Sequence, residues 1–142
     1  MYKKDYIVRQ FEEFGKVMAI ILGFKHKGEW NRFAGEIEEA VKQFTSIELK
    51  EIKSLSQDDF ETLINTNTNL KSDQLKILAD LLYEQSFAEK EKADRNAQTE
   101  LFKKSLFLYK LYKNELTANE FNLEVHYRIE LLSKLLNQPN PL

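Results

Sequence analysis

The sequence predicts an all-α fold of about six or seven amphipathic helices, stacked as antiparallel hairpins in a single domain over residues 1–142. First, the 142 residues include only four Gly and two Pro, whereas sandwiches and barrels use many such residues in their turns. Second, hydrophobic residues recur at helical spacing along most of the chain. Third, the composition of 42% hydrophobic and 31% charged residues is that of a globular protein.

A first helix is expected from Asp5, whose carboxylate can cap backbone N–H groups, to Gly23. It carries two neighbouring hydrophobic stripes. The longer stripe contains Ile7, Phe11, Phe14, Met18 and Ile21, and the shorter one contains Val17, Ile20 and Phe24. Because the two stripes cover much of the circumference, this helix is either wedged between several helices or covered by a second chain. In the second case, a homodimer would form through Phe11, Phe14, Met18 and Ile21.

The region from residue 29 to residue 71 is expected to hold a longer helix, two short helices and a loop. The longer helix covers residues 29–44, with a seam of Trp30, Phe33, Ile37, Ala40 and Phe44. Ser46 is expected to cap a short helix, and Ser56 with Asp59 resembles a capping box ahead of a second one. Residues 65–69 alternate Asn and Thr, which is typical of a loop. An internal boundary is therefore expected near residues 65–71.

Residues 72–137 are expected to form three longer helices. The first begins at Ser72 and Asp73, and a charged run over residues 89–95 marks either a tight turn near residues 94–96 or one bent helix. A capping box at residues 117–120 opens the last helix. The second and third helices each carry two stripes. In the second helix, one stripe is Leu101, Ser105, Leu108 and Tyr112, and the other is Phe102, Leu106 and Tyr109. In the third helix, one stripe is Phe121, Val125, Ile129, Leu132 and Leu136, and the other is Leu123, Tyr127, Leu131 and Leu135. Double stripes predict that these helices are contacted on two sides.

The stretch from residue 75 to residue 136 resembles tetratricopeptide-type helical repeats. Residues 77–84 resemble a first repeat helix and residues 100–109 a second, with Ser105 at the position where a small residue lets two helices approach. Residues 125–132 resemble the start of another unit, and residues 4–10 resemble the start of an uncharacterised bacterial family whose members carry such repeats. The resemblance implies a protein-interaction module, and it transfers no binding residue to this chain.

Most catalytic and ligand-binding chemistries have no matching pattern in the sequence. There is no cysteine, the four glycines are isolated, and neither His26 nor His126 belongs to the Glu-x-x-His motif of helical metal sites. We therefore expect a protein that is not an enzyme and that uses no metal or cofactor. The net charge of −2, from interspersed acidic and basic residues, predicts no nucleic-acid partner.

Membrane insertion is not expected either. The longest apolar run, residues 17–24, is much shorter than the roughly 20 residues that cross a bilayer. It also follows Glu12 and Glu13, where a secretory signal would be basic. These features, with the lack of cysteine, predict a cytoplasmic protein.

The leading functional hypothesis is a non-enzymatic protein–protein interaction module that binds a protein or peptide partner in a groove between hairpins. The candidate partner-binding residues are polar positions expected to be exposed on the helix that begins at Ser72, namely Lys76, Asp80, Tyr83 and Glu84. The alternative is a helical bundle that binds or senses a small molecule in a pocket of its Phe-rich core, since the chain has ten Phe.

Overall fold

The computed structural model describes residues 2–116 and 122–137, with side chains from Asp5 onward. Seven helices and no strands form in these ranges, so the prediction of an all-α fold with six or seven helices is confirmed. The helices are α1 (Tyr2–His26), α2 (Trp30–Thr45), α3 (Leu49–Ser54), α4 (Gln57–Thr66), α5 (Ser72–Glu91), α6 (Arg95–Glu115) and α7 (Leu123–Leu136).

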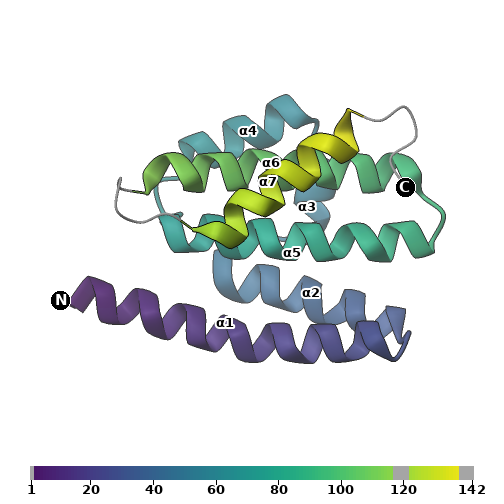
Figure 1. The fold of residues 1–142 in the computed structure, drawn as a ribbon, viewed down its shortest axis with the longest axis horizontal. Coiled ribbons are helices and arrows are strands. Elements are labelled where there is room, and N and C mark those ends of the chain that lie inside the picture. The colour runs from purple at the N-terminus through teal and green to yellow at the C-terminus, as the bar shows by residue number, and fades with distance from the viewer. Residues whose placement is uncertain (1, 117–121, 138–142) are drawn as a thin grey trace.

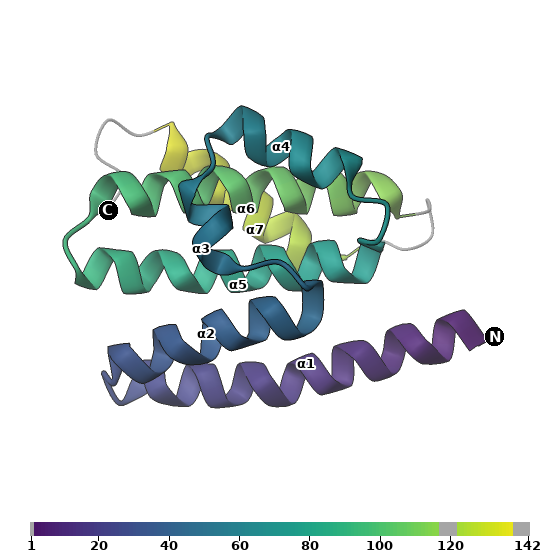
Figure 2. The same cartoon turned by 180° about the vertical axis from the view of Figure 1, so that it is seen from behind.

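Two helical hairpins lie side by side and form the body of the molecule (Figure 1). The first hairpin is α1–α2 and the second is α5–α6, and α5 contacts both helices of the first hairpin. Helix α7 crosses the second hairpin on one face, and α3 with α4 covers the opposite face (Figures 1 and 2). Helix α5 is therefore the central element of the fold.

One hydrophobic core joins the two hairpins. It includes Phe33 and Phe60 from one side of the 65–71 connection, and Leu78 and Phe102 from the other. Helix α6 is buried on both of its stripes: Leu101, Leu108 and Tyr112 on one, and Phe102 and Tyr109 on the other. The prediction of a helix contacted on two sides is thus confirmed for α6.

Helix α7 does not follow that prediction. Its inner stripe reaches the core through Val125 and Leu132, but its second stripe faces outward. Leu123, Tyr127 and Leu131 are exposed by 54%, 60% and 41%. The reason is that α7 is the outermost helix on its face, so that among the described residues no element lies over its outer side (Figure 1).

The long stripe of α1 packs within the chain. Phe14 and Ile21 are buried, and Phe11 and Met18 are partly buried against the same core. Phe14 meets Phe44 of α2 edge to face, with ring centroids 5.5 Å apart. The face predicted for a homodimer is therefore already used inside one chain, because α1 lies against both α2 and α5.

Three predicted helix ends are wrong. Helix α1 begins at Tyr2, before the expected start at Asp5. Helix α1 continues through Gly23 to His26, and the left-handed residue that follows it is Gly28, with φ 70°. Ser46 does not cap a following helix, because it adopts a left-handed conformation at the end of α2, with φ 62°. Its N–H donates to the carbonyl of Lys42, so Ser46 closes α2.

Other predicted ends are confirmed or settled by the structure. The Ser56 hydroxyl oxygen accepts a hydrogen bond from the Asp59 N–H at 3.1 Å, which caps α4. The charged run forms a turn between two helices, with Ala93 at φ 58° and Asp94 capping α6. The capping box expected at residues 117–120 lies outside the described residues, and Asn122 is the N-cap of α7.

Candidate functional site

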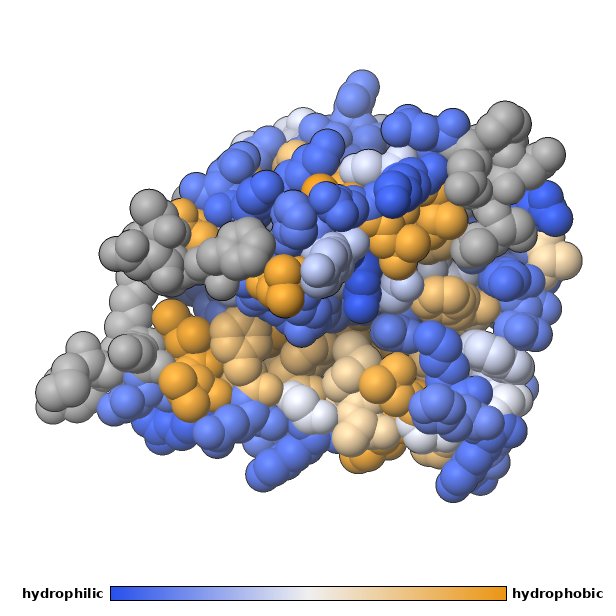
Figure 3. Space-filling view, viewed as in Figure 1, coloured by the Kyte–Doolittle hydropathy of each residue, from blue (hydrophilic) through white to orange (hydrophobic). Residues whose placement is uncertain are grey.

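The candidate site is the furrow between α1 and α7, whose floor is one face of α5. Asp73, Lys76, Asp80, Tyr83, Glu84 and Phe87 share this face, because their spacing of three or four residues follows the helical repeat. We call this the α5 groove. Figure 3 shows a band of hydrophobic residues along the furrow, bordered by hydrophilic residues. Most other residues of α5 are buried, apart from Ser72, Gln74, Lys90 and Glu91 near its two ends.

All four residues predicted to bind a partner, Lys76, Asp80, Tyr83 and Glu84, lie on this face. The expectation that they are exposed is wrong, however. Asp80 and Glu84 are only 7% and 8% exposed, and Lys76 and Tyr83 are half-buried. They are covered by side chains of α1, α6 and α7, which approach the groove from distant parts of the sequence.

A hydrogen-bond network centred on Asp80 ties α5, α6 and α7 together. One carboxylate oxygen accepts from the Lys76 ammonium at 2.8 Å, and the other accepts from the buried Tyr109 hydroxyl. The Tyr109 oxygen in turn accepts from Arg128 Nη1 at 3.2 Å. Both oxygens of this buried carboxylate are therefore satisfied.

Stacked cations form the rim of the groove. On the α7 side, the Arg128 guanidinium carbon lies 3.8 Å from the centroid of the Tyr83 ring. On the α1 side, the Lys25 ammonium lies 3.9 Å from the centroid of Phe87 and 2.9 Å from a Glu84 oxygen. Such cation–ring contacts hold flat aromatic faces in place at the surface.

The charges of the network follow from burial and pairing. Burial raises the pKa of the Asp80 carboxyl, although Lys76 and Tyr109 oppose this rise. Burial alone would lower the pKa of Lys76, but the negative charge of Asp80 and a contact with Glu124 raise it instead. Burial and the neighbouring Asp80 raise the pKa of Tyr109 well above its ordinary value. Lys76 is therefore a cation at neutral pH, and Tyr109 remains a hydrogen-bond donor.

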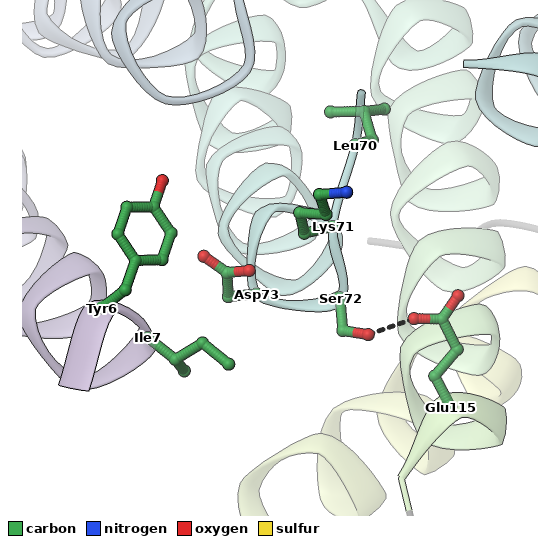
Figure 4. A pocket seen from close by; sticks show the side chains of 7 residues that line it. All are labelled: Tyr6, Ile7, Leu70, Lys71, Ser72, Asp73 and Glu115. Atoms are coloured by element: carbon green, nitrogen blue, oxygen red, sulfur yellow. Dashed lines mark hydrogen bonds between the residues drawn. The ribbon is translucent and has the colours of Figure 1, made fainter. Parts of the chain in front are cut away.

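Two cavities lie along the α1 side of the groove. One has a volume of about 300 Å³ and is lined by Phe11, Phe14, Lys76, Tyr112 and Asn122. The other has a volume of about 320 Å³ and lies at the start of α5, between α1 and the end of α6 (Figure 4). Its lining consists of Tyr6, Ile7, Leu70, Lys71, Ser72, Asp73 and Glu115. Volumes of this size are at the lower limit of ordinary ligand sites.

Five residues of this site were missed by sequence reasoning: Lys25, Asp73, Phe87, Tyr109 and Arg128. Tyr109 offered a signal, since a tyrosine on a core stripe needs a partner for its hydroxyl group. Lys25 and Arg128 offered none, because each acts on an aromatic ring that lies far away in the sequence.

The described residues bear on three further points, namely metal binding, an ion pair on α7 and membrane insertion. Within them, no group of three or more His, Asp or Glu side chains is close enough to hold a metal ion. His126 contacts Glu130, one helical turn further along α7, with 3.2 Å between Nε2 and a carboxylate oxygen. Among the helices of the described ranges, none combines the length and the hydropathy needed to cross a bilayer.

The fold and the site thus define an all-α protein with an ordered polar groove between α1 and α7. Comparisons of the chain with protein-family models, with curated proteins and with solved structures gave no match.

Proposed function

We propose that this chain is a cytoplasmic, non-enzymatic interaction module that holds a segment of a partner protein in the α5 groove. The proposal includes a tetratricopeptide-like use of the fold, in which the furrow between hairpins receives the partner. The observation that carries it is the order of the groove: its polar side chains are already held by α1, α6 and α7 before any partner binds.

Pre-formed order supports binding because ordering a side chain on association costs free energy. Tyr83 is fixed beneath Arg128, and Lys25 is fixed between Glu84 and Phe87. A partner segment that enters the groove meets rigid aromatic and charged surfaces. Tyr and Arg are also the side chains that most often dominate the binding energy of protein interfaces.

The mixture of groups in the groove suits a peptide. Half-buried aromatic rings offer contact area to hydrophobic side chains, and the rim cations Lys25 and Arg128 can donate to carbonyl groups of a peptide backbone. The two cavities on the α1 side, of about 300 and 320 Å³, would receive individual side chains of the segment. A partner segment that lies along α1 would place side chains into both cavities.

The alternative, a small-molecule site in the Phe-rich core, stays a prediction. The cavities described above open between helices at the surface. Their phenylalanine lining comes from Phe11 and Phe14, whereas Phe33, Phe60 and Phe102 are fully buried in the core. The structure therefore offers more support for a peptide in the groove.

The test is to select binding peptides from a displayed library with the purified protein and to map their site by substitution. We expect Tyr83→Ala and Arg128→Ala each to weaken the selected peptides at least tenfold, about 1.4 kcal/mol. The matched control is Tyr127→Ala, because Tyr127 is 60% exposed on the outer side of α7. It should leave the affinity unchanged.

Each variant must first be shown to be folded by circular dichroism. A library that yields no saturable binder, or binders that depend on Tyr127 and are indifferent to Tyr83 and Arg128, would overturn the proposal.

A further inference from the structure

The pocket at the start of α5 contains a buried carboxylate that the fold leaves without a partner. Asp73 is only 3% exposed, yet its Oδ2 atom accepts no hydrogen bond. An acceptor that is shielded from water and left unpaired destabilises the folded chain. Figure 4 shows the carboxylate in the space between α1 and α5, near Tyr6.

Two of the neighbouring donors are already engaged. The Ser72 hydroxyl donates to Glu115, across the pocket from Asp73 (Figure 4). The Lys71 N–H donates to the side-chain oxygen of Gln74 at 2.7 Å. The positive end of the α5 dipole is favourable for a negative charge, but it supplies no hydrogen atom to Oδ2. Asp73 can therefore gain a donor from a ligand.

The rest of the lining indicates the shape of that ligand. Ile7, Leu70 and the ring of Tyr6 form apolar walls, while Asp73 and Glu115 provide two carboxylates and Lys71 provides one ammonium group. Apolar walls that end in carboxylates fit a side chain with an aliphatic stem and a cationic head. An anion is disfavoured, because the two carboxylates outweigh the single positive charge of Lys71. The terminal torsion of aspartate is broad, so the Asp73 carboxylate can turn toward a bound cation.

We propose that this pocket takes an organic cation, the lysine or arginine side chain of a partner segment. The inference rests on the proposed function for the identity of the chain that carries the cation. The pocket and the central part of the groove are both on the α5 face, so one segment can fill both.

The test measures binding of small probes by NMR, using the resonances of Ile7 and Leu70. Nα-acetyl-arginine N-methylamide and the lysine equivalent should shift both resonances saturably. The neutral glutamine derivative should bind at least tenfold more weakly. Asp73→Asn keeps the shape of the side chain and removes its charge, and it should weaken both cations at least tenfold.

The matched control is Glu130→Gln, which removes the same charge from an exposed position on α7. Glu130→Gln should leave the affinities for the arginine and lysine derivatives unchanged. If it weakens them as much as Asp73→Asn does, the inference is overturned, because only the net charge of the protein would then matter. Spermidine is the probe for a free amine. If spermidine binds more tightly than the arginine and lysine derivatives, the assignment of the pocket to a lysine or arginine side chain is overturned. If Asp73→Asn does not fold, Glu115→Gln tests the same pocket and should also weaken both cations.

The two proposals can fail separately. If selected peptides bind through Tyr83 and Arg128 but are indifferent to Asp73→Asn, the cation pocket is overturned and the groove stands. If no peptide is selected but the arginine derivative binds in a manner that depends on Asp73, the cation pocket is supported and the proposed function fails.

Discussion

Replacing Tyr109 by phenylalanine removes one oxygen atom from the centre of the α5 groove and leaves the aromatic ring in place. The Tyr109 hydroxyl group donates a hydrogen bond to Asp80, and its oxygen accepts one from Arg128 Nη1 at 3.2 Å. Both the Tyr109 and the Asp80 side chains are buried, so water cannot readily replace the lost donor. The substitution thus tests whether the network holds the groove in its observed form.

The expected cost follows from the partners of the hydroxyl group. A hydrogen bond to a charged group contributes about 1.5–3 kcal/mol, and the loss of this donor leaves one oxygen of Asp80 unsatisfied. Arg128 is half-buried and can turn to water, so its part of the loss is small. We therefore expect Tyr109→Phe to lower the free energy of unfolding by about 1.5–3 kcal/mol. At roughly 4 °C per kcal/mol for a chain of this length, Tm falls by about 6–12 °C.

The assay is urea unfolding followed by far-ultraviolet circular dichroism at pH 7. The midpoint should fall while the slope with urea stays constant, because the variant exposes the same surface on unfolding. Tyr127→Phe is the matched control, since Tyr127 is 60% exposed, and it should change the free energy by less than about 0.5 kcal/mol. A loss below about 0.5 kcal/mol for Tyr109→Phe would refute the claim that this network stabilises the groove.

Three further predictions concern α1, α6 and the charge of Asp80. Ile21→Ala should lower the free energy of unfolding by about 2–5 kcal/mol, because Ile21 is fully buried. Ile20 is 52% exposed, so Ile20→Ala should lower it by less than about 0.5 kcal/mol. Thermal unfolding measures both changes. Burial disfavours the charge of Lys104 and lowers its pKa. Lys104→Met removes that buried charge, so it should leave the free energy of unfolding unchanged or raise it by up to about 1 kcal/mol. Lys103→Met is the control at an exposed position. Burial raises the pKa of Asp80, so in the acidic range the folded chain keeps a proton there that the unfolded chain releases. In urea titrations, the stability of the native protein relative to Asp80→Asn should therefore fall as the pH rises above about 4.

Each of these predictions has a contrary result. Equal effects at Ile20 and Ile21, or a stability that depends on protein concentration, would show that α1 is covered by a second chain. A loss of more than about 1 kcal/mol for Lys104→Met would show that its charge is used in the fold. A relative stability that rises with pH would show that the ion pair with Lys76 outweighs the burial of Asp80.

The helices and their stripes could be predicted from the sequence because both depend on neighbours along the chain. The 3.6-residue repeat defined the stripes of α1, α6 and α7, and the cap at Ser56 needed only residues three positions apart. Ser46 shows the limit of such reasoning. A serine can open or close a helix, and in the structure the left-handed Ser46 closes α2.

The candidate site was predicted in part. The helical repeat placed Lys76, Asp80, Tyr83 and Glu84 on one face, and the structure keeps them together. Their burial could not be predicted, because it depends on side chains that lie far away in the sequence, such as Lys25, which is 59 positions before Glu84.

The sequence by itself thus determined an all-α chain of amphipathic helices and the set of residues on each helical face. Only the tertiary structure decided which of two similar stripes is covered, since α6 has helices on both sides and α7 lies at the edge. Only it could show that Asp80 finds two donors while Oδ2 of Asp73 finds none. The physical reason is that a helical face depends on local spacing, whereas burial and hydrogen bonding depend on which distant segments meet.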